Sequence, residues 1–203
     1  MAFTYFFRDV DTLRAIERHA IPQLKGRRYI NVWDAGCAMG PEPYSLAIIF
    51  RENVGPFLFR NIKIYASDVD GSDRFGAIIA EGTYPHETVK RIPAGLLRKY
   101  FSLVAHRPGQ FRIDAELMRA VCYQRHDLLS LKPIRSGFGM IVCKNVLLHF
   151  KPEQRVDVIN MFHAALASGG FLAFEQTQEL PARNASLFER VAADAQLFQK
   201  PPA

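Results

Sequence analysis

Short apolar runs alternate along this chain with segments whose apolar residues recur at helical spacing. The runs predict strands at 29–33, 61–67, 111–113, 120–124, 138–143, 171–174 and 196–199, and the periodic segments predict helices at 14–24, 42–51, 72–80, 93–101, 151–167 and 186–193. Strands that alternate with helices are typical of a mainly parallel sheet with right-handed crossovers and helices on both faces. We therefore expect an α/β fold in which residues 1–203 form a single domain, with a small insertion at about 83–118.

Polar residues and glycines follow the ends of four predicted strands. They lie at 34–40 and at Asp68, Asp127 and Asn145. In a parallel sheet the carboxyl ends of the strands share one edge, and ligands bind outside it, near the point where the strand order reverses. The sequence therefore predicts one ligand site built from these loops.

Composition sets the class of the chain. Its 203 residues are 49% hydrophobic, 12% aromatic and 23% charged, which excludes a disordered chain. The longest apolar stretch, 44–50, is far shorter than the roughly 20 residues of a membrane span, so we expect no membrane insertion, and the first residues show no signal-peptide pattern. The three cysteines and six histidines have no metal-ligand or redox spacing, so we expect free thiols in a reducing cytoplasm and no metal site.

The net charge is +6 and the excess is not uniform: between Thr83 and Arg112, within the insertion, Glu87 is the one acidic residue against Lys90, Arg91, Arg98, Lys99, Arg107 and Arg112. A solvated basic face is the simplest interpretation of this segment. The alternative is a surface that attracts an acidic partner. No RNP-type motif, zinc finger or basic heptad accompanies the charge, so an acidic protein is favoured over nucleic acid.

The glycine loop after the first strand differs from the phosphate-binding loops. It lacks G-x-G-x-x-G, because Ala38 takes the second glycine position, and it lacks G-K-[ST]. A dinucleotide dehydrogenase and a P-loop enzyme are therefore disfavoured. An adenosyl cofactor without phosphates needs a carboxylate after the second strand for its ribose hydroxyls. Asp68 has that position, although a simple turn residue at a strand end would have it too.

Six segments match, in order, the motifs of one enzyme family. The matches are TYFFRD (4–9) with T-x-F-F-R-[ED], VWDAGCAMGPEPYS (32–45) with W-S-A-[GA]-[CA]-S-T-G-E-E-P-Y-S, YASDVD (65–70) with A-[ST]-D-I-D, AEGTY (80–84) with A-x-x-G-x-Y, YF (100–101) with Y-F, and CKNVLLHF (143–150) with C-R-N-V-x-x-Y-F. The resemblance as a whole extends from Thr4 to about Glu175 and covers most of the chain. On these segments the chain resembles the CheR-type chemotaxis methyltransferases, which act on glutamate side chains of chemoreceptors.

The resemblance implies a class I, Rossmann-like methyltransferase that uses S-adenosylmethionine and releases S-adenosylhomocysteine. In the family, Glu42 matches the carboxylate that meets the methionine amino group and Asp68 the one that holds the ribose. The cofactor-binding positions that the resemblance implies are Thr4, Arg8, Gly36, Glu42, Asp68, Asp127, Leu128, Asn145 and Val146. Asp127 and Leu128 match the pair on the adenine side, and Asn145 and Val146 the pair beside the donor methyl.

Two residues are candidates for the chemistry itself. A glutamate acceptor is already an anion at neutral pH, so holding it in place matters more than a strong base. We expect Arg8 to orient that carboxylate, because a guanidinium can pair with it bidentately. His149 stands where the family has tyrosine, and we hypothesise that it orients the substrate; a buried histidine at a strand-to-helix turn is the alternative.

The sequence departs from the family pattern in ways that lead to further expectations. Ala38, Met39 and Pro41 replace two hydroxyl residues and one carboxylate, so we expect weaker cofactor binding. The family carries a helical N-terminal domain ahead of the T-x-F-F-R segment, and we expect this chain either to lack it or to be a fragment. The insertion looks too poor in strands to provide the peptide tether of some family members.

Three hypotheses about function follow. The first is a methyltransferase for glutamates of an acidic helical protein such as the cytoplasmic domain of a chemoreceptor. The second is a regulatory module that binds S-adenosylmethionine or S-adenosylhomocysteine without turnover. The third is a methyltransferase for another acceptor.

Overall fold

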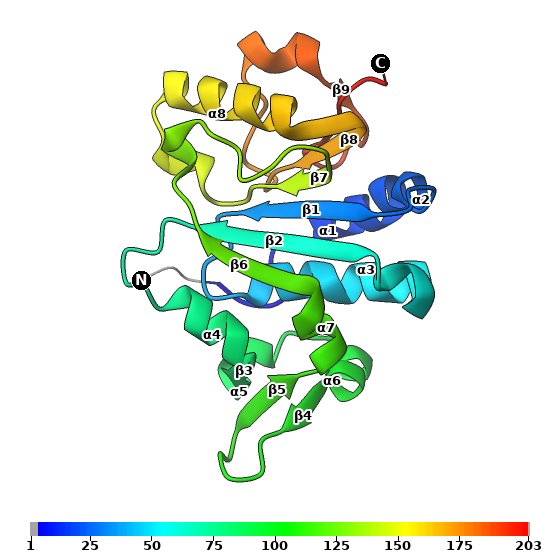
Figure 1. Cartoon of the computed structure of the whole chain (residues 1–203), viewed down its shortest axis with the longest axis vertical. Coiled ribbons are helices and arrows are strands. Elements are labelled where there is room, and N and C mark those ends of the chain that lie inside the picture. Colours follow the sequence, from blue (N-terminus) through cyan, green and yellow to red (C-terminus); the bar gives the residue numbers. More distant parts are fainter. Residues whose placement is uncertain (1–3, 203) are drawn as a thin grey trace.

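The computed structural model describes residues 4–202, and its centre is a seven-stranded sheet. The strands are β1 (Ile30–Ala35), β2 (Ile62–Asp68), β3 (Thr83–Pro85), β4 (Phe101–Leu103), β5 (Gln110–Ile113), β6 (Val121–Arg125), β7 (Phe138–Val142), β8 (Leu166–Ala173), β9 (Glu189–Arg190) and β10 (Leu197–Gln199). The large sheet has the order β6-β2-β1-β7-β8-β10-β9 (Figure 1). Its first five strands are parallel, and β10 and β9 are antiparallel additions. The expected mainly parallel α/β fold is confirmed.

Helices cover the large sheet and connect its strands. They are α1 (Val10–Ala15), which continues through the π turn η1 (Ile16–Ala20) into α2 (Ile21–Leu24), then α3 (Pro41–Phe59), α4 (Phe75–Glu81), α5 (His86–Val89), α6 (Ala94–Tyr100), α7 (Ala115–Ala120) and α8 (Pro152–Ala165). Short 3-10 turns are η2 (Leu128–Ser130), η3 (Leu147–His149) and η4 (Ala182–Leu187). Among the described residues no helix is both long and apolar enough to cross a membrane.

Side chains that alternate along the strands divide into two cores. On β1, Ile30 and Val32 face the core that contains α3 and the N-terminal helices, whereas Trp33 and Ala35 face the core under α8. Successive side chains of a strand point to opposite faces, so a strand buried on both faces is apolar throughout. This explains why the predicted strands of the large sheet are continuous apolar runs.

Helix α3 is buried on more than one side, as its apolar sequence predicts. Every residue from Pro41 to Phe50 is buried. The helix begins after Gly40, whose φ of 104° is left-handed, and Pro41 fits the first helical position because that N–H has no intrahelical partner. It extends beyond the predicted end at residue 51, across a kink at Gly55–Pro56 where Gly55 has φ 74°.

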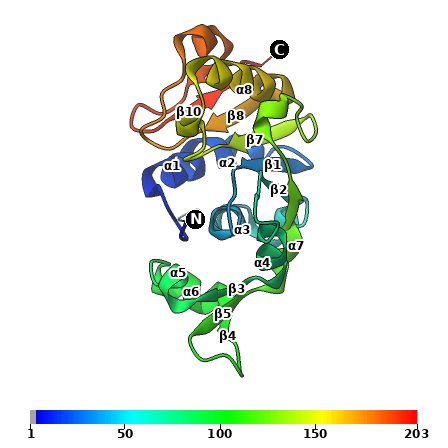
Figure 2. The ribbon, with the colours of Figure 1, turned by 90° about the vertical axis from the view of Figure 1, so that its left-hand side faces the viewer.

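The insertion contains more strands than the sequence suggests. Strands β3, β5 and β4 form a separate antiparallel sheet, with Tyr84 opposite Phe111 and Ser102 opposite Arg112. Figure 2 shows this small sheet at the end of the molecule away from α8. The expectation of few strands was wrong, because β3 and β4 have only three residues each and such short strands leave no readable alternation.

One predicted helix is also absent. Residues 186–193 form the end of η4 and the strand β9, in which Arg190 pairs with Phe198 of β10. Phe188 is only 7% exposed and packs into the core beside the His163 ring. The burial of Phe188 and the pairing with β10 override the local helical pattern.

Candidate functional site

A cavity of about 730 Å³ opens where the parallel strands end. Its walls come from the segment before α1, the first turn of α3 and the loops after β1, β2, β6 and β7. The strand order reverses between β1 and β7, so this is the edge at which α/β sheets bind ligands. All ten expected site residues line it: Thr4, Arg8, Gly36, Glu42, Asp68, Asp127, Leu128, Asn145, Val146 and His149.

The loop after β1 is fastened to the end of β2. The Gly36 and Cys37 amides donate to the Ser67 carbonyl at 2.7 and 3.0 Å, and the Ala38 amide donates to Asp68 Oδ2 at 3.0 Å. Gly36 has φ 105°, and a Cβ there would lie 2.1 Å from Val146 Cγ2, so only glycine fits. The close approach of this loop to Val146 joins two walls of the cavity.

Backbone strain is concentrated around the cavity. Four non-glycine residues there have positive φ: Phe7 at 58°, Asp9 at 57°, Ala38 at 47° and Asn145 at 58°. This left-handed conformation costs energy for residues with a Cβ and is often found at functional sites. Phe7, Asp9 and Asn145 thus have left-handed turns where the segment around Arg8 contacts the loop after β7.

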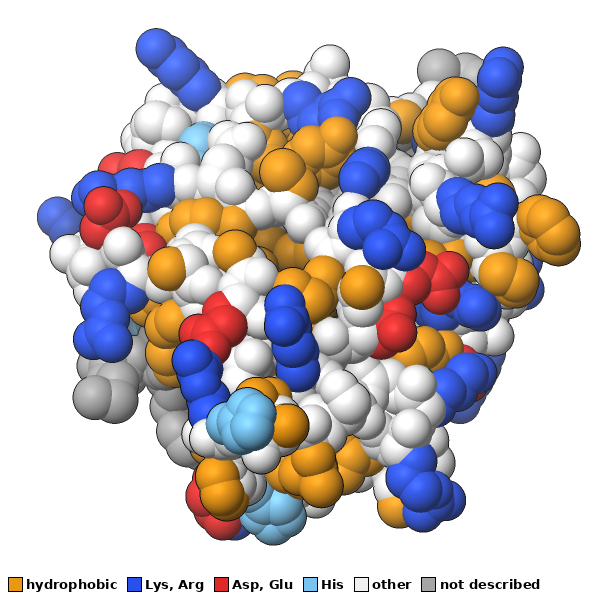
Figure 3. Space-filling view, turned by 60° about the horizontal axis from the view of Figure 1, so that its bottom comes forward, with side chains coloured by type: hydrophobic (Ala, Val, Ile, Leu, Met, Phe, Trp, Pro, Cys, Tyr) orange, Lys and Arg blue, Asp and Glu red, His pale blue; other side chains and the backbone are white. Residues whose placement is uncertain are grey.

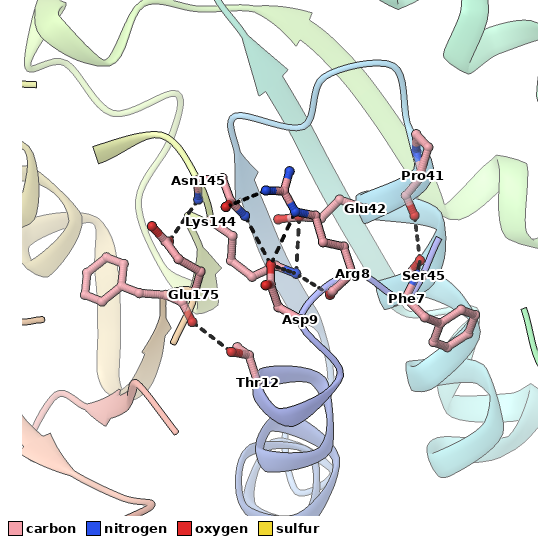
Figure 4. Close-up of polar contacts among 11 residues, drawn as sticks. Phe7, Arg8, Asp9, Thr12, Pro41, Glu42, Ser45, Lys144, Asn145 and Glu175 are labelled. Carbon is pink, nitrogen blue, oxygen red and sulfur yellow. Dashed lines mark hydrogen bonds and ion pairs between the residues drawn. The ribbon is translucent and has the colours of Figure 1, made fainter. Parts of the chain in front are cut away.

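A buried lysine in the wall of the cavity joins three elements (Figure 4). Lys144 Nζ lies 2.9 Å from the Arg8 carbonyl, 3.3 Å from Glu42 Oε2 and 3.5 Å from Asp9 Oδ2. Its side chain is 1% exposed, so this charge depends on the neighbouring carboxylates for its stability. Lys144 therefore ties the N-terminal segment and α3 to the loop after β7.

Asn145 and Arg8 meet on the same side of the cavity (Figure 4). Arg8 Nη2 donates to Asn145 Oδ1 at 2.7 Å, and Asn145 Nδ2 donates to Asp9 Oδ2 at 3.1 Å. The Asn145 amide donates to Glu175 Oε2 at 2.9 Å. Burial raises the pKa of Glu175. These bonds fix the orientation of the Asn145 side-chain amide, through both its oxygen and its nitrogen, and the direction of the Arg8 guanidinium.

Glu42 faces the cavity with a carboxylate that the protein only partly satisfies. Its side chain is 9% exposed, and Oε1 has no hydrogen-bond partner among the described residues. Asp34 lies behind it, fully buried, and neither of its carboxyl oxygens has a donor within residues 4–202. Burial, and next the Glu42 carboxylate, hold the pKa of Asp34 well above its ordinary value.

The far end of the cavity is more apolar. Leu128 is buried there, while Val69 and Leu129 are 58% and 40% exposed and present aliphatic surface. Asp127 caps η2 by accepting from the Leu129 amide at 2.9 Å. These side chains offer an apolar surface to a ligand, with the Asp127 carboxylate beside it.

His149 is exposed and lies at the mouth of the cavity, in η3 after β7. The alternative of a buried histidine is therefore wrong. Leu148 beside it is 47% exposed. The mouth thus carries a titratable ring next to an aliphatic side chain.

Sequence reasoning missed four charged residues that organise this site: Asp9, Asp34, Lys144 and Glu175. Asp34 carried a usable signal, since it stands where the motif that the chain resembles has serine. No group of three or more His, Cys, Asp or Glu side chains among the described residues has an arrangement that could hold a metal ion.

Comparison with known proteins agrees with this geometry. Residues 2–197 match the family model "CheR methyltransferase, SAM binding domain". The chain is 31% identical over 177 residues to a chemotaxis protein methyltransferase of Listeria innocua, covering 86% of this chain and 64% of that protein. It is 30% identical over 189 residues to chemotaxis protein methyltransferase 1 of Pseudomonas aeruginosa, covering 88% and 67%.

The chain spans only part of several relatives. It covers 18% of an uncharacterized 104.1 kDa protein of Rhodobacter capsulatus, with 31% identity over 176 residues.

Among solved structures, the rRNA methyltransferase AviRa of Streptomyces viridochromogenes has a TM-score of 0.58 at 13% identity, over 98% of this chain and 86% of that one. This last likeness shows the fold alone, a class I methyltransferase fold. The chain belongs to the CheR methyltransferase family and carries its S-adenosylmethionine-binding domain.

Proposed function

We propose that this chain transfers the methyl group of S-adenosylmethionine to glutamate carboxylates of an acidic helical protein such as the cytoplasmic domain of a chemoreceptor. The observation that carries the proposal is one cavity in which Glu42, Asp68 and the Arg8–Asn145 pair lie together. The names of the chemotaxis relatives support the acceptor class. A chemoreceptor's methylated helices lie in the cytoplasm, so the proposal assigns the chain to that compartment.

The donor set of the cavity suits the cofactor. Glu42 Oε1, which no described residue satisfies, would accept from the cofactor's ammonium. Asp68 is already oriented by the Ala38 and Asp70 amides, at 3.0 and 3.2 Å, and would accept from the ribose hydroxyls. Val69, Leu128 and Leu129 would enclose the adenine, with Asp127 at its edge.

Catalysis would depend on placement. The bound cofactor would supply an electrophilic methyl carbon; the acceptor's carboxylate oxygen would bond to that carbon in line as the carbon–sulfur bond breaks and S-adenosylhomocysteine leaves. Arg8 would bind the acceptor carboxylate, because its guanidinium lies on the cavity wall and Asn145 Oδ1 fixes its direction. His149 at the mouth would donate a second hydrogen bond to that carboxylate. No residue needs to remove a proton, since the acceptor is an anion.

Long-range charge would bring the acceptor to the cavity. Figure 3 shows a face on which Lys and Arg side chains outnumber Asp and Glu. The six basic residues of the insertion are all exposed, although Lys90, Lys99 and Arg107 pair with Glu87, Glu52 and Glu81. Arg98 and Arg112 have no carboxylate partner within residues 4–202, so positive potential remains for an acidic partner.

The test is incubation with methyl-labelled cofactor and a panel of chemoreceptor cytoplasmic fragments, followed by counting base-labile methyl esters. We expect labelled ester on an acidic helical fragment. Bound cofactor without any labelled acceptor would favour the regulatory module, and label that is stable to base would indicate another acceptor group.

Substitution of Arg8 identifies the acceptor contact. Arg8→Ala should lower ester formation at saturating cofactor by at least about tenfold, because the acceptor is no longer held in line. Arg28→Ala is the matched control, since Arg28 is exposed beside the opposite end of β1 and touches no part of the cavity. Equal rates for both variants would remove Arg8 from the mechanism.

A further inference from the structure

Four buried carboxyl oxygens have no hydrogen donor among the described residues: both oxygens of Asp34, Oε1 of Glu42 and Oε1 of Glu175. A buried carboxylate without donors is costly, and two facing carboxylates are costlier still. Of the remaining carboxylates, Glu42 acts on Asp34 most: it raises the pKa of Asp34 both through its negative charge and through a side-chain hydrogen-bond interaction. One proton between them would satisfy an oxygen on each residue.

Lys144 cannot supply the missing donors. An ammonium has three N–H groups, and Lys144 Nζ already has three acceptors at 2.9 to 3.5 Å, on Arg8, Glu42 and Asp9. Only one of these, Glu42 Oε2, belongs to the facing pair. Lys144 thus stabilises the charge on Glu42 and leaves Asp34 without a direct cation.

Of the other groups that act on Asp34, Asp68 favours its neutral form and Lys144 opposes it. Asp68 at the end of β2 adds negative charge, and the thiols of Cys37 and Cys143 are buried, which raises their pKa and keeps them neutral. The Lys144 charge lowers the pKa of Asp34, but its effect is smaller than those of burial and Glu42.

We propose that Asp34 is held as a neutral carboxylic acid whose O–H donates to Glu42 Oε1, and that it thereby positions the ionised Glu42 carboxylate for a ligand ammonium. Asp34 is fully buried and does not line the cavity, so it acts through Glu42 and is a positioning residue. The inference rests on the proposed role of Glu42 toward the cofactor. It goes further by assigning the proton.

Two substitutions separate a neutral donor from a buried anion. Asp34→Asn keeps the shape and offers an N–H to Glu42, whereas Asp34→Leu keeps the approximate size and offers none. Calorimetry with S-adenosylhomocysteine at neutral pH should give Asp34→Asn an affinity within about threefold of the wild type and Asp34→Leu a loss of about tenfold or more. Equal losses in the two variants would overturn the proposal, because they would mean that the charge of Asp34 is needed.

Infrared spectroscopy of the ligand-free protein reads the proton directly. The wild type should show the carbonyl stretch of a protonated carboxylic acid at neutral pH, and the wild-type minus Asp34→Asn difference should contain it. Glu175→Gln and Asp127→Asn are matched controls. Both keep the Asp34 band, so this band should be absent from their wild-type minus variant difference spectra. Absence of the band from the Asp34→Asn difference would refute the proposal whether or not Asp34→Leu folds.

The outcomes distinguish this inference from the proposed function. If the wild type fails to bind S-adenosylhomocysteine, the proposed cofactor site itself is wrong. If it binds and the infrared band is missing, only the assignment of the proton to Asp34 fails.

Discussion

The Asp68 carboxylate has a fixed orientation at the cavity because two backbone amides donate hydrogen bonds to it. The Ala38 amide holds Oδ2 at 3.0 Å and the Asp70 amide holds Oδ1 at 3.2 Å, which leaves the remaining lone pairs directed away from the loop. This arrangement needs Ala38 in a left-handed conformation, with φ 47°. A residue with a hydroxyl is not required at position 38, since the contact is made by the backbone.

Asp68→Asn should weaken S-adenosylhomocysteine binding by roughly tenfold to a hundredfold. A hydrogen bond to a charged group contributes about 1.5–3 kcal/mol, and the amide both loses the charge and places an N–H against a backbone donor. Calorimetry measures the change. Asp73→Asn is the control, because Asp73 is exposed in the same loop and does not line the cavity. Unchanged affinity in Asp68→Asn would contradict the ribose contact.

Asp34 makes stability depend on pH in a known direction. Its pKa in the folded protein lies well above the ordinary 3.8, so the folded state keeps a proton that the unfolded chain releases. The free energy of unfolding therefore falls as pH rises from about 3.8 toward the raised value, and Glu175, whose pKa is also raised, acts in the same sense.

Asp34→Asn should remove the part of this slope that belongs to Asp34. Urea unfolding midpoints of the ligand-free protein, measured from about 1 to about 4 units above the ordinary pKa (roughly pH 5 to pH 8), should fall less steeply with pH in the variant than in the wild type. Parallel curves would show that Asp34 titrates alike in both states. Glu175 and the other carboxyl groups are common to both proteins, so they cancel in the comparison.

At the scale of single residues, the motifs predicted where the cavity is but not how it is held together. Arg8, Glu42 and Asn145 could be named because they stand at fixed places in the family motifs. Glu175 could not, since its importance comes from its burial and from its contact to the Asn145 amide, which is distant in sequence. Asp9 also has a place in the first motif, but the motif does not reveal its bond to Asn145. Only the fold brings position 9 to position 145.

At the scale of the elements, the insertion contacts the loop after β1 through the hydroxyl of Tyr84. Tyr84 of β3 is 3% exposed, and its OH donates to the Met39 carbonyl at 3.0 Å. A Cβ at Gly40 would lie 2.4 Å from the same hydroxyl, so the loop and the strand are in close contact. The small sheet therefore supports the loop that carries Ala38.

Tyr84→Phe should loosen that loop and weaken S-adenosylhomocysteine binding several-fold. Loss of one buried hydrogen bond costs about 1 kcal/mol, which corresponds to a Tm lower by about 2–4 °C in a chain of this size. Tyr44→Phe is the matched control, because the Tyr44 hydroxyl donates to the Ile79 carbonyl at 2.6 Å and holds α4 instead. We expect a similar loss of Tm in the control with binding unchanged; equal effects on binding would mean that Tyr84 acts only on overall stability.

Elements with a clear hydrophobic period were predicted from the sequence, and short strands that depend on pairing with a neighbouring strand were not. Strands β1, β2 and β7 and helix α8 lie close to their predicted ranges, because each is long enough to show its period and buried enough to need it. Strands β4 and β9 have three and two residues, and they exist only because β5 and β10 pair with them. The local residue propensities of such short segments do not predict this pairing.

At the scale of the whole molecule, the proposed methyl transfer belongs to the cavity and the proposed attraction of an acidic acceptor belongs to the basic insertion. The cavity lies at the carboxyl edge of the large sheet, and the exposed Arg98 and Arg112 belong to the small sheet and its helix α6. Because the two are separate, a change of surface charge should alter the encounter with an acceptor and leave the cofactor site as it is.

Arg98→Glu combined with Arg112→Glu should lower kcat/KM for an acidic acceptor fragment by about tenfold at low salt, because electrostatic steering acts on the rate of encounter. The difference from the wild type should nearly vanish at about 1 M salt, where the Debye length falls to roughly 3 Å. Affinity for S-adenosylhomocysteine should not change. Lys25→Glu with Arg28→Glu, which reverses two exposed charges outside the insertion, is the control with the same net charge. If both double variants lose rate equally, total charge is responsible and the insertion has no special part in recognising the acceptor.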